Sequence, residues 1–256
     1  YYDAQIALIQ DNLDKLHLFR QLVPVRNSRF LEQHDPAKYT IGADAFRRNG
    51  FDTSQGDFHV FLVDHSNSTL FKHCLEDIQV ALKTTLKNLG NSGQDKYYYI
   101  VFYNNEKNFQ QLGVPDEERW YSATQKTDFI AETKRISGIV PEGEASDPTQ
   151  GLNWIFRPIS PVINEPGKCV DTLWLVSNGP FSATPENLLN RVEGYQNKLV
   201  DMGRKKARIN TVGFARRDHD LDEADDAAPS TLKRIVELSP PDAPGEYLLI
   251  VPDESI

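Results

Sequence analysis

The chain of 256 residues is poor in cysteine, in long apolar segments and in positive charge. Its two cysteines, Cys74 and Cys169, cannot form a disulfide framework or ligate zinc by themselves. Two free thiols are favoured over a single bridge between them. No apolar run reaches the roughly 18–20 residues that a membrane-spanning helix needs, so we expect no membrane span. The 28 Lys and Arg against 37 Asp and Glu leave a net charge of −9. This argues against nucleic acid as the main partner, because phosphate contacts require a basic face.

The short motifs that mark common enzyme classes are also missing. There is no Gly-x-Ser-x-Gly elbow, no phosphate-loop lysine motif, no Gly-x-Gly-x-x-Gly after a strand and no His-Glu-x-x-His. We therefore expect a protein that is not an enzyme. One enzymatic alternative stays open, a phosphohydrolase-like α/β enzyme with Asp64 as its nucleophile. Such chemistry would require a second acid and a lysine beside Asp64, and the sequence identifies neither.

The N-terminal part of the chain has a pattern of its own. Over residues 1–24, apolar side chains recur at the heptad spacing of an amphipathic helix or a short coiled coil: Tyr2, Ile6, Ile9, Leu13 and Leu16. This helix could dock on the main domain or join two copies into a homo-oligomer. Residues 25–56 are polar and rich in turn signals, which predicts a connector. Since the chain begins at Tyr1 with no methionine or apolar leader, we expect its native start to be missing. The compartment stays open, with a slight preference for the cell envelope.

From residue 57 onward, apolar segments alternate regularly with segments of helical periodicity. Short apolar runs predict strands at 58–63, 96–103, 170–176, 207–214 and 246–251. Helices are predicted between them at 69–89, 124–136, 147–156, 184–202 and 230–238. This alternation is typical of an open, doubly wound, mostly parallel Rossmann-like sheet with helices on both faces.

In such sheets the binding site lies at the carboxyl ends of the strands. The first predicted strand ends in Asp64 and is followed by Ser66 and Ser68, while Ser146 precedes a helix and Asn178 follows a later strand. These side chains are all oxygen donors, which suit Mg²⁺ better than zinc. Because few of the donors are charged, a bound cation would remain able to accept a carboxylate from outside.

Asp64-x-Ser66-x-Ser68 after an apolar strand resembles the metal-ion-dependent adhesion site of von Willebrand factor A domains. Ser146 stands where the family's second loop has a threonine, and the segment 173–179 is similar to its strand ending in Thr-Asp-Gly. The segments 208–214 and 232–237 resemble the family's last strand and helix, in a form frequent among bacterial members. The resemblance covers residues 57–256 and implies that Asp64, Ser66, Ser68 and Ser146 hold Mg²⁺, or Mn²⁺ or Ca²⁺, directly or through water.

Asn178 is a departure from the family pattern, which usually has aspartate there. An amide in that outer position keeps a hydrogen bond but removes a negative charge, so the site is degenerate and cation binding would be weaker. A retained fold with an empty or weak site is therefore the alternative to a working metal site.

The resemblance implies a protein-binding or assembly module in which an Asp or Glu of a protein partner completes the cation's coordination. The alternative is a metal-independent scaffold subunit that assembles through residues 1–24. Near the site, His65 and the aromatic pair Trp120 and Tyr121 are candidates for contacts with a partner. Packing within the protein is the favoured alternative for all three.

Overall fold

The centre of the domain is one sheet of seven strands in the order β1-β7-β6-β5-β2-β3-β4. It was obtained as a computed structural model that describes residues 40–67, 69, 74–104, 115, 118–143, 145–177, 181–214 and 227–251. The strands are β1 (Thr40–Gly42), β2 (Phe58–Asp64), β3 (Tyr97–Tyr103), β4 (Tyr121–Ser122), β5 (Thr172–Ser177), β6 (Arg208–Phe214) and β7 (Tyr247–Val251). Neighbouring strands are parallel except β3 and β4, which are antiparallel.

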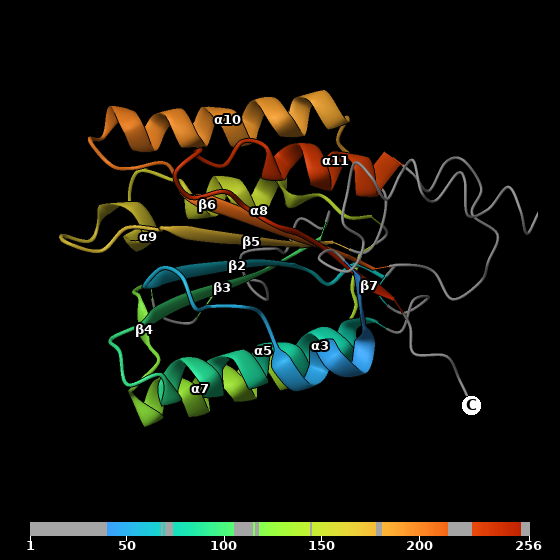
Figure 1. The fold of residues 1–256 in the computed structure, drawn as a ribbon, viewed down its shortest axis with the longest axis vertical. Coiled ribbons are helices and arrows are strands. Elements are labelled where there is room, and N and C mark those ends of the chain that lie inside the picture. Colours follow the sequence, from blue (N-terminus) through green and yellow to red (C-terminus); the bar gives the residue numbers. More distant parts are fainter. Residues whose placement is uncertain are drawn as a thin grey trace, which may run out of the picture. The chain divides into compact units, whose positions relative to one another are not determined.

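Helices cover both faces of this sheet (Figure 1). On one face lie α3 (Ala43–Asn49), α5 (Cys74–Asn91) and α7 (Lys126–Gly138). The other face carries α8 (Pro148–Ile155), α9 (Pro161–Asn164), α10 (Pro185–Asp201) and α11 (Ala227–Val236). This is the doubly wound, mostly parallel α/β architecture that the sequence predicts. No helix in the described part of the chain is long and apolar enough to cross a membrane.

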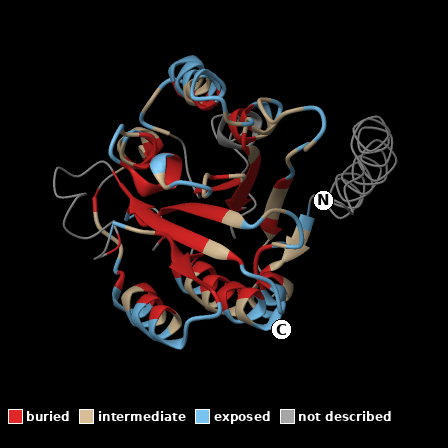
Figure 2. Cartoon of the chain, turned by 90° about the vertical axis from the view of Figure 1, so that its left-hand side faces the viewer, coloured by how far each residue is buried: buried red, intermediate tan, exposed pale blue. Residues whose placement is uncertain are grey.

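The central strands β2 and β5 are mostly apolar and are buried along nearly their whole length, because both of their faces are covered (Figure 2). On the α3/α5 face, the ring of Phe51 makes edge contacts with Phe61 and Trp174 at centroid distances of 5.2 Å each. Phe46 of α3 adds a further edge contact to Phe51 at 5.1 Å. Residues that precede the first predicted strand therefore form part of the core.

These contacts correct the predicted boundary of the domain. Residues 25–56 were expected to form a connector, but their described part contains β1, which pairs with β7, and α3, which packs on α5. The folded domain thus includes residues from Thr40 onward rather than only those from 57. The sequence pattern misses β1 and α3 because both are short and lie among turn signals. The predicted helix over residues 1–24 lies outside the described residues.

Two predicted helix starts, at 147 and 184, agree with the caps in the structure, whereas α7 and α11 begin at Lys126 and Ala227 rather than at 124 and 230. Asp147 caps α8 and Thr184 caps α10, each with proline at the first helical position. The short elements β4 and α9 were not predicted.

The order of the strands sets the place of a site. The chain leaves β2 to form β3 on one side and later returns to form β5 on the other. The carboxyl ends of β2 and β5 therefore flank the point where the strand order reverses, which is where open α/β sheets bind their ligands.

Candidate functional site

Three neighbouring strands end in polar side chains at this reversal point. Asp64 is the last residue of β2 and is in register with Tyr103, the last residue of β3. Val63 is in register with Val176, so Ser177, at the end of β5, lies beside Asp64. In-register residues of parallel strands point to the same face. The three side chains therefore gather on the α8 face of the sheet, and all three are buried.

The turn after β2 fixes Ser66 beside Asp64. The Ser66 backbone N–H donates a 2.8 Å hydrogen bond to Oδ1 of Asp64, the arrangement of an Asx turn. Thr69 then donates from its backbone N–H and its hydroxyl to the Ser66 carbonyl, at 2.9 and 2.7 Å. The next loop supports this turn, because the Asn67 N–H donates to the carbonyl of Gly143. Gly143 has φ of +82°, a conformation that glycine adopts at low cost.

Ser146 reaches the same place from the loop before α8. Its Oγ lies 3.3 Å from the Ser177 Oγ and donates a long, 3.5 Å hydrogen bond to the Tyr103 hydroxyl. Its backbone carbonyl accepts a 3.0 Å bond from the N–H of Ser182, which follows β5. Asp147 is occupied with capping α8, since its Oδ1 accepts the Thr149 N–H at 2.9 Å. The carboxylate of Asp147 thus serves the helix.

The close approach of α8 to β2 depends on Gly151. A Cβ atom at this position would lie 2.3 Å from Cδ1 of Leu62. Glycine therefore lets α8, and with it Ser146 at the start of the helix, come close to the end of β2.

The electrostatics of the cluster are dominated by Asp64. Burial lowers the pKa of His65 below its ordinary value, so the ring is neutral at pH 7 and adds no positive charge beside Asp64. The pKa of Tyr103 lies well above its ordinary value because of burial and the nearby charge of Asp64. The described cluster therefore presents a carboxylate among neutral hydroxyls.

This set of donors fits a hard divalent cation. Carboxylate and hydroxyl oxygens are ligands for Mg²⁺, Mn²⁺ or Ca²⁺, whereas zinc prefers nitrogen and sulfur. Within the described residues there is no group of three or more His, Cys, Asp or Glu that could hold a metal ion. A site here would therefore rely on hydroxyls, as the sequence motif implies.

Of the five predicted metal-site residues, the structure brings together Asp64, Ser66 and Ser146. Ser68 and Asn178 lie outside the described residues. Sequence reasoning did not assign a role to the hydroxyls of Tyr103 and Ser177. Their only signal in the sequence is that each ends a buried strand.

The three predicted partner contacts are buried: His65, Trp120 and Tyr121 are 2%, 3% and 5% exposed. The His65 Nδ1–H donates to the carbonyl of Val140 at 3.1 Å, and the Trp120 Nε1–H donates to the carbonyl of Pro161 at 3.1 Å. Their side chains present no binding surface in this structure. All three side chains pack within the protein, as the alternative interpretation expected.

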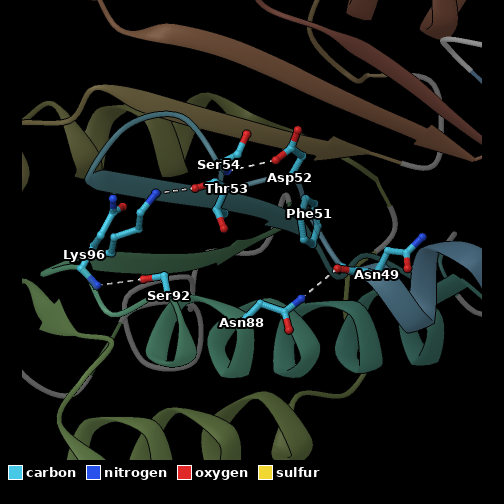
Figure 3. A pocket seen from close by; sticks show the side chains of 10 residues that line it. Asn49, Phe51, Asp52, Thr53, Ser54, Asn88, Ser92 and Lys96 are labelled. Carbon is cyan, nitrogen blue, oxygen red and sulfur yellow. Dashed lines mark hydrogen bonds between the residues drawn. The ribbon is translucent and has the colours of Figure 1, made fainter.

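A pocket lies near the amino ends of β2 and β3, away from the Asp64 cluster (Figure 3). It has a volume of about 490 Å³ and is lined by Asn49, Gly50, Phe51, Asp52, Thr53, Ser54, Asn88, Ser92, Gln94 and Lys96. The Lys96 ammonium is buried and donates to the carbonyls of Thr53 at 2.6 Å and Gly56 at 2.9 Å. These bonds hold the loop before β2 in place, so the buried charge of this pocket has a structural role.

Comparisons with known proteins identify the fold. No family model and no curated protein matches the chain. The pilus adhesin SpaC from Lactobacillus rhamnosus GG, in its open conformation, is similar with a TM-score of 0.55 and 13% identity, over 81% of this chain and 29% of that chain. Another crystal structure of SpaC gives a TM-score of 0.52 and 12% identity over the same shares. For manganese-loaded TRAP protein from Plasmodium vivax the TM-score is 0.41 and the identity 12%, over 72% of this chain and 63% of that chain.

At 12–13% identity the similarity to SpaC shows the fold and nothing finer. The chain therefore has the von Willebrand factor A-like fold that its strand-end motifs predict.

Proposed function

We propose that this chain is a non-enzymatic protein-binding or assembly module that uses a divalent cation. Asp64, Ser66, Ser68 and Ser146 would hold Mg²⁺, Mn²⁺ or Ca²⁺, and an Asp or Glu of a protein partner would complete the coordination. The observation that carries the proposal is the cluster at the reversal point. There Asp64 accepts a hydrogen bond from the Ser66 N–H and lies beside the buried hydroxyls of Ser146 and Ser177.

Charge balance explains why the partner would be acidic. Asp64 supplies one negative charge, and the hydroxyls of the cluster supply none. Asn178 adds no charge at the edge of the site. A divalent cation held by these groups keeps about one net positive charge by this count, which a carboxylate from a second protein would neutralise.

The fold supports a role in binding. The structure with which this chain shares its fold is described as a pilus adhesin, and the chain spans 29% of the length of that protein. A role in adhesion or assembly for this chain is therefore part of the proposal. The partner itself is defined here only by its chemistry, an exposed Asp or Glu.

Thermal unfolding of the protein and its Asp64→Asn variant, in Mn²⁺, Mg²⁺ or EDTA, tests the cation site. Asparagine is similar in size and keeps an oxygen to accept the Ser66 N–H, but it lacks the charge. Cation at about 100 times its dissociation constant should stabilise the wild type by about 2.7 kcal/mol. For a domain of this size the unfolding midpoint rises by roughly 2–4 °C. The shift should disappear in Asp64→Asn.

Asp95→Asn is the matched control, because it removes one carboxylate from an exposed position elsewhere on the domain. It should keep the full cation shift. A cation shift of equal size in Asp64→Asn would rule out this site. If cations do not shift the unfolding midpoint of the wild type, and if self-assembly is unchanged by EDTA, the metal-independent scaffold would be favoured instead. Turnover of a phosphate ester that Asp64→Asn abolishes would favour the enzymatic alternative.

A further inference from the structure

We infer that Tyr103 is a positioning residue for the proposed cation site. Its hydroxyl accepts a hydrogen bond from the Ser146 hydroxyl, which points the Ser146 proton away and leaves the oxygen lone pairs for the cation. The inference rests on the proposed function and assigns a role to a residue outside the strand-end motif. It starts from the directions of two hydrogen bonds, from Tyr103 to Val176 and from Ser146 to Tyr103, among buried groups.

The direction of the first bond is fixed by its acceptor. The Tyr103 hydroxyl lies 3.0 Å from the backbone carbonyl of Val176, which can only accept. The single hydroxyl proton of Tyr103 is therefore used in this bond. A tyrosine hydroxyl keeps its proton near neutral pH, because its ordinary pKa is about 10.

The direction of the second bond follows from the first. With its proton committed to Val176, the Tyr103 oxygen can act toward other hydroxyls only as an acceptor. Ser146 therefore donates to it across 3.5 Å. The Ser177 hydroxyl also forms a hydrogen bond to Tyr103 and lies 3.3 Å from Ser146. With the Ser146 proton directed toward Tyr103, the Ser177 hydroxyl can donate either to Tyr103 or to Ser146.

This direction matters because a serine oxygen can bind a cation only through a lone pair, with its proton pointing elsewhere. Ser146 has two lone pairs, and even if one accepts the Ser177 proton, the other is left. Groups that orient metal ligands in this way affect metal affinity strongly, and their loss typically weakens it by about 10–100-fold.

Tyr103→Phe tests the role directly, because it keeps the buried ring and removes only the oxygen. Binding of Mn²⁺ to the intact chain is measured from the electron paramagnetic resonance signal of the free ion. We expect the dissociation constant to rise about ten-fold or more. Unfolding midpoints in EDTA are measured in parallel, to separate the loss of affinity from a loss of stability.

Tyr99→Phe is the matched control. Tyr99 lies four residues before Tyr103 on the same strand and on the same face, and both side chains are fully buried. The Tyr99 hydroxyl accepts a 3.2 Å hydrogen bond from the Trp154 indole N–H. Its substitution removes a buried hydroxyl of the same kind away from the site. It should lower the unfolding midpoint in EDTA by a similar amount and leave Mn²⁺ affinity unchanged.

Ser177→Ala distinguishes Tyr103 from the other acceptor available to Ser146. If Tyr103 takes the Ser146 proton, Ser177→Ala weakens Mn²⁺ binding less than Tyr103→Phe does. Wild-type affinity in Tyr103→Phe, an equal loss in Tyr99→Phe, or a greater loss in Ser177→Ala would each overturn the inference while leaving the cation site standing. A wild type that binds no Mn²⁺ would instead overturn the proposed function, and the inference with it.

Discussion

His59, near the amino end of β2, makes the stability of the domain depend on pH. Its side chain is fully buried and its Nε2–H donates to the carbonyl of Gly56 at 3.2 Å. Its Nδ1 atom has no hydrogen-bond partner among the described residues. Burial, together with the positive charge of Lys96, lowers the pKa of His59 to about 4. The protonated ring is therefore disfavoured in the folded protein.

The sign of the effect follows from comparing the two states. In the unfolded chain the histidine has its ordinary pKa of about 6.5 and takes up a proton as the pH falls below that value, whereas the folded protein does so only near pH 4. Between these values the unfolded state binds more protons, so the free energy of unfolding falls as the pH falls. A difference of 2.5 units between 6.5 and about 4 corresponds to about 3 kcal/mol in full. Most of it, about 2.5 kcal/mol, is lost between pH 7.5 and 4.5.

His59→Gln provides the test, because glutamine can donate an amide N–H to Gly56 but does not titrate. Urea unfolding at pH 7.5, 6.5, 5.5 and 4.5 gives the free energy of unfolding of each protein as a function of pH. The difference between the two curves reports the titration of His59. Other titrating groups, including His65, are present in both proteins and cancel. The variant should be less stable at pH 7.5, because the packing of the ring is lost, and should fall less steeply toward pH 4.5. Parallel profiles would refute the assignment of the buried, neutral ring.

Two further substitutions test how the domain is built. Gly151→Ala should cost about 1–3 kcal/mol of unfolding free energy in urea, because the added methyl group meets Leu62, and it should also weaken Mn²⁺ binding by displacing α8; unchanged stability would contradict the close contact. Phe46→Ala should cost about 3–5 kcal/mol, since its fully buried ring contacts Phe51 and Phe214; a loss below about 1 kcal/mol would argue against placing residues 40–49 in the core.

The sequence predicts the fold well where local signals agree with burial. The segments that form β2, β3 and β5 are nearly continuous apolar runs, as expected of strands covered on both faces. Helices α8 and α10 begin at a capping side chain followed by proline. By contrast, β1 has three residues and β4 has two, too few for a periodic pattern. These strands exist because a neighbouring strand offers them hydrogen bonds.

The site divides in the same way between local and distant information. Asp64 and Ser66 belong to one short motif, and the hydrogen bond between them is local. The hydroxyl of Tyr103 belongs to a run of tyrosines in β3, and its role depends on which of them faces α8 at the end of the strand. That is decided by the register with β2 and by a carbonyl 73 residues away on Val176. No pattern within the run carries this information.

The sequence also could not predict the burial of Trp120 and Tyr121, which lie at the amino ends of β2 and β3, away from the site. Trp120 lies in the long segment between the predicted strand at 96–103 and the predicted helix at 124–136. Its side chain is polar at one end, as that of an exposed anchor for a partner would be. Its indole N–H instead donates to Pro161, 41 residues later in the chain, and its ring packs edge-on against Phe58. Whether an aromatic side chain binds a partner or fills the interior depends on such long-range contacts.

The segment 146–151 links the stability of the domain to the proposed binding site. Ser146 provides a hydroxyl to the cluster, Asp147 caps α8 with the next side chain, and Gly151 allows the helix to approach β2. A change that moves α8 therefore moves a proposed cation ligand, even when it touches no ligand itself. Cation binding, in turn, would hold the start of α8 against the ends of β2 and β5. The two effects are reciprocal, so a substitution that displaces the start of α8, where Ser146 lies, should lower stability and cation affinity together.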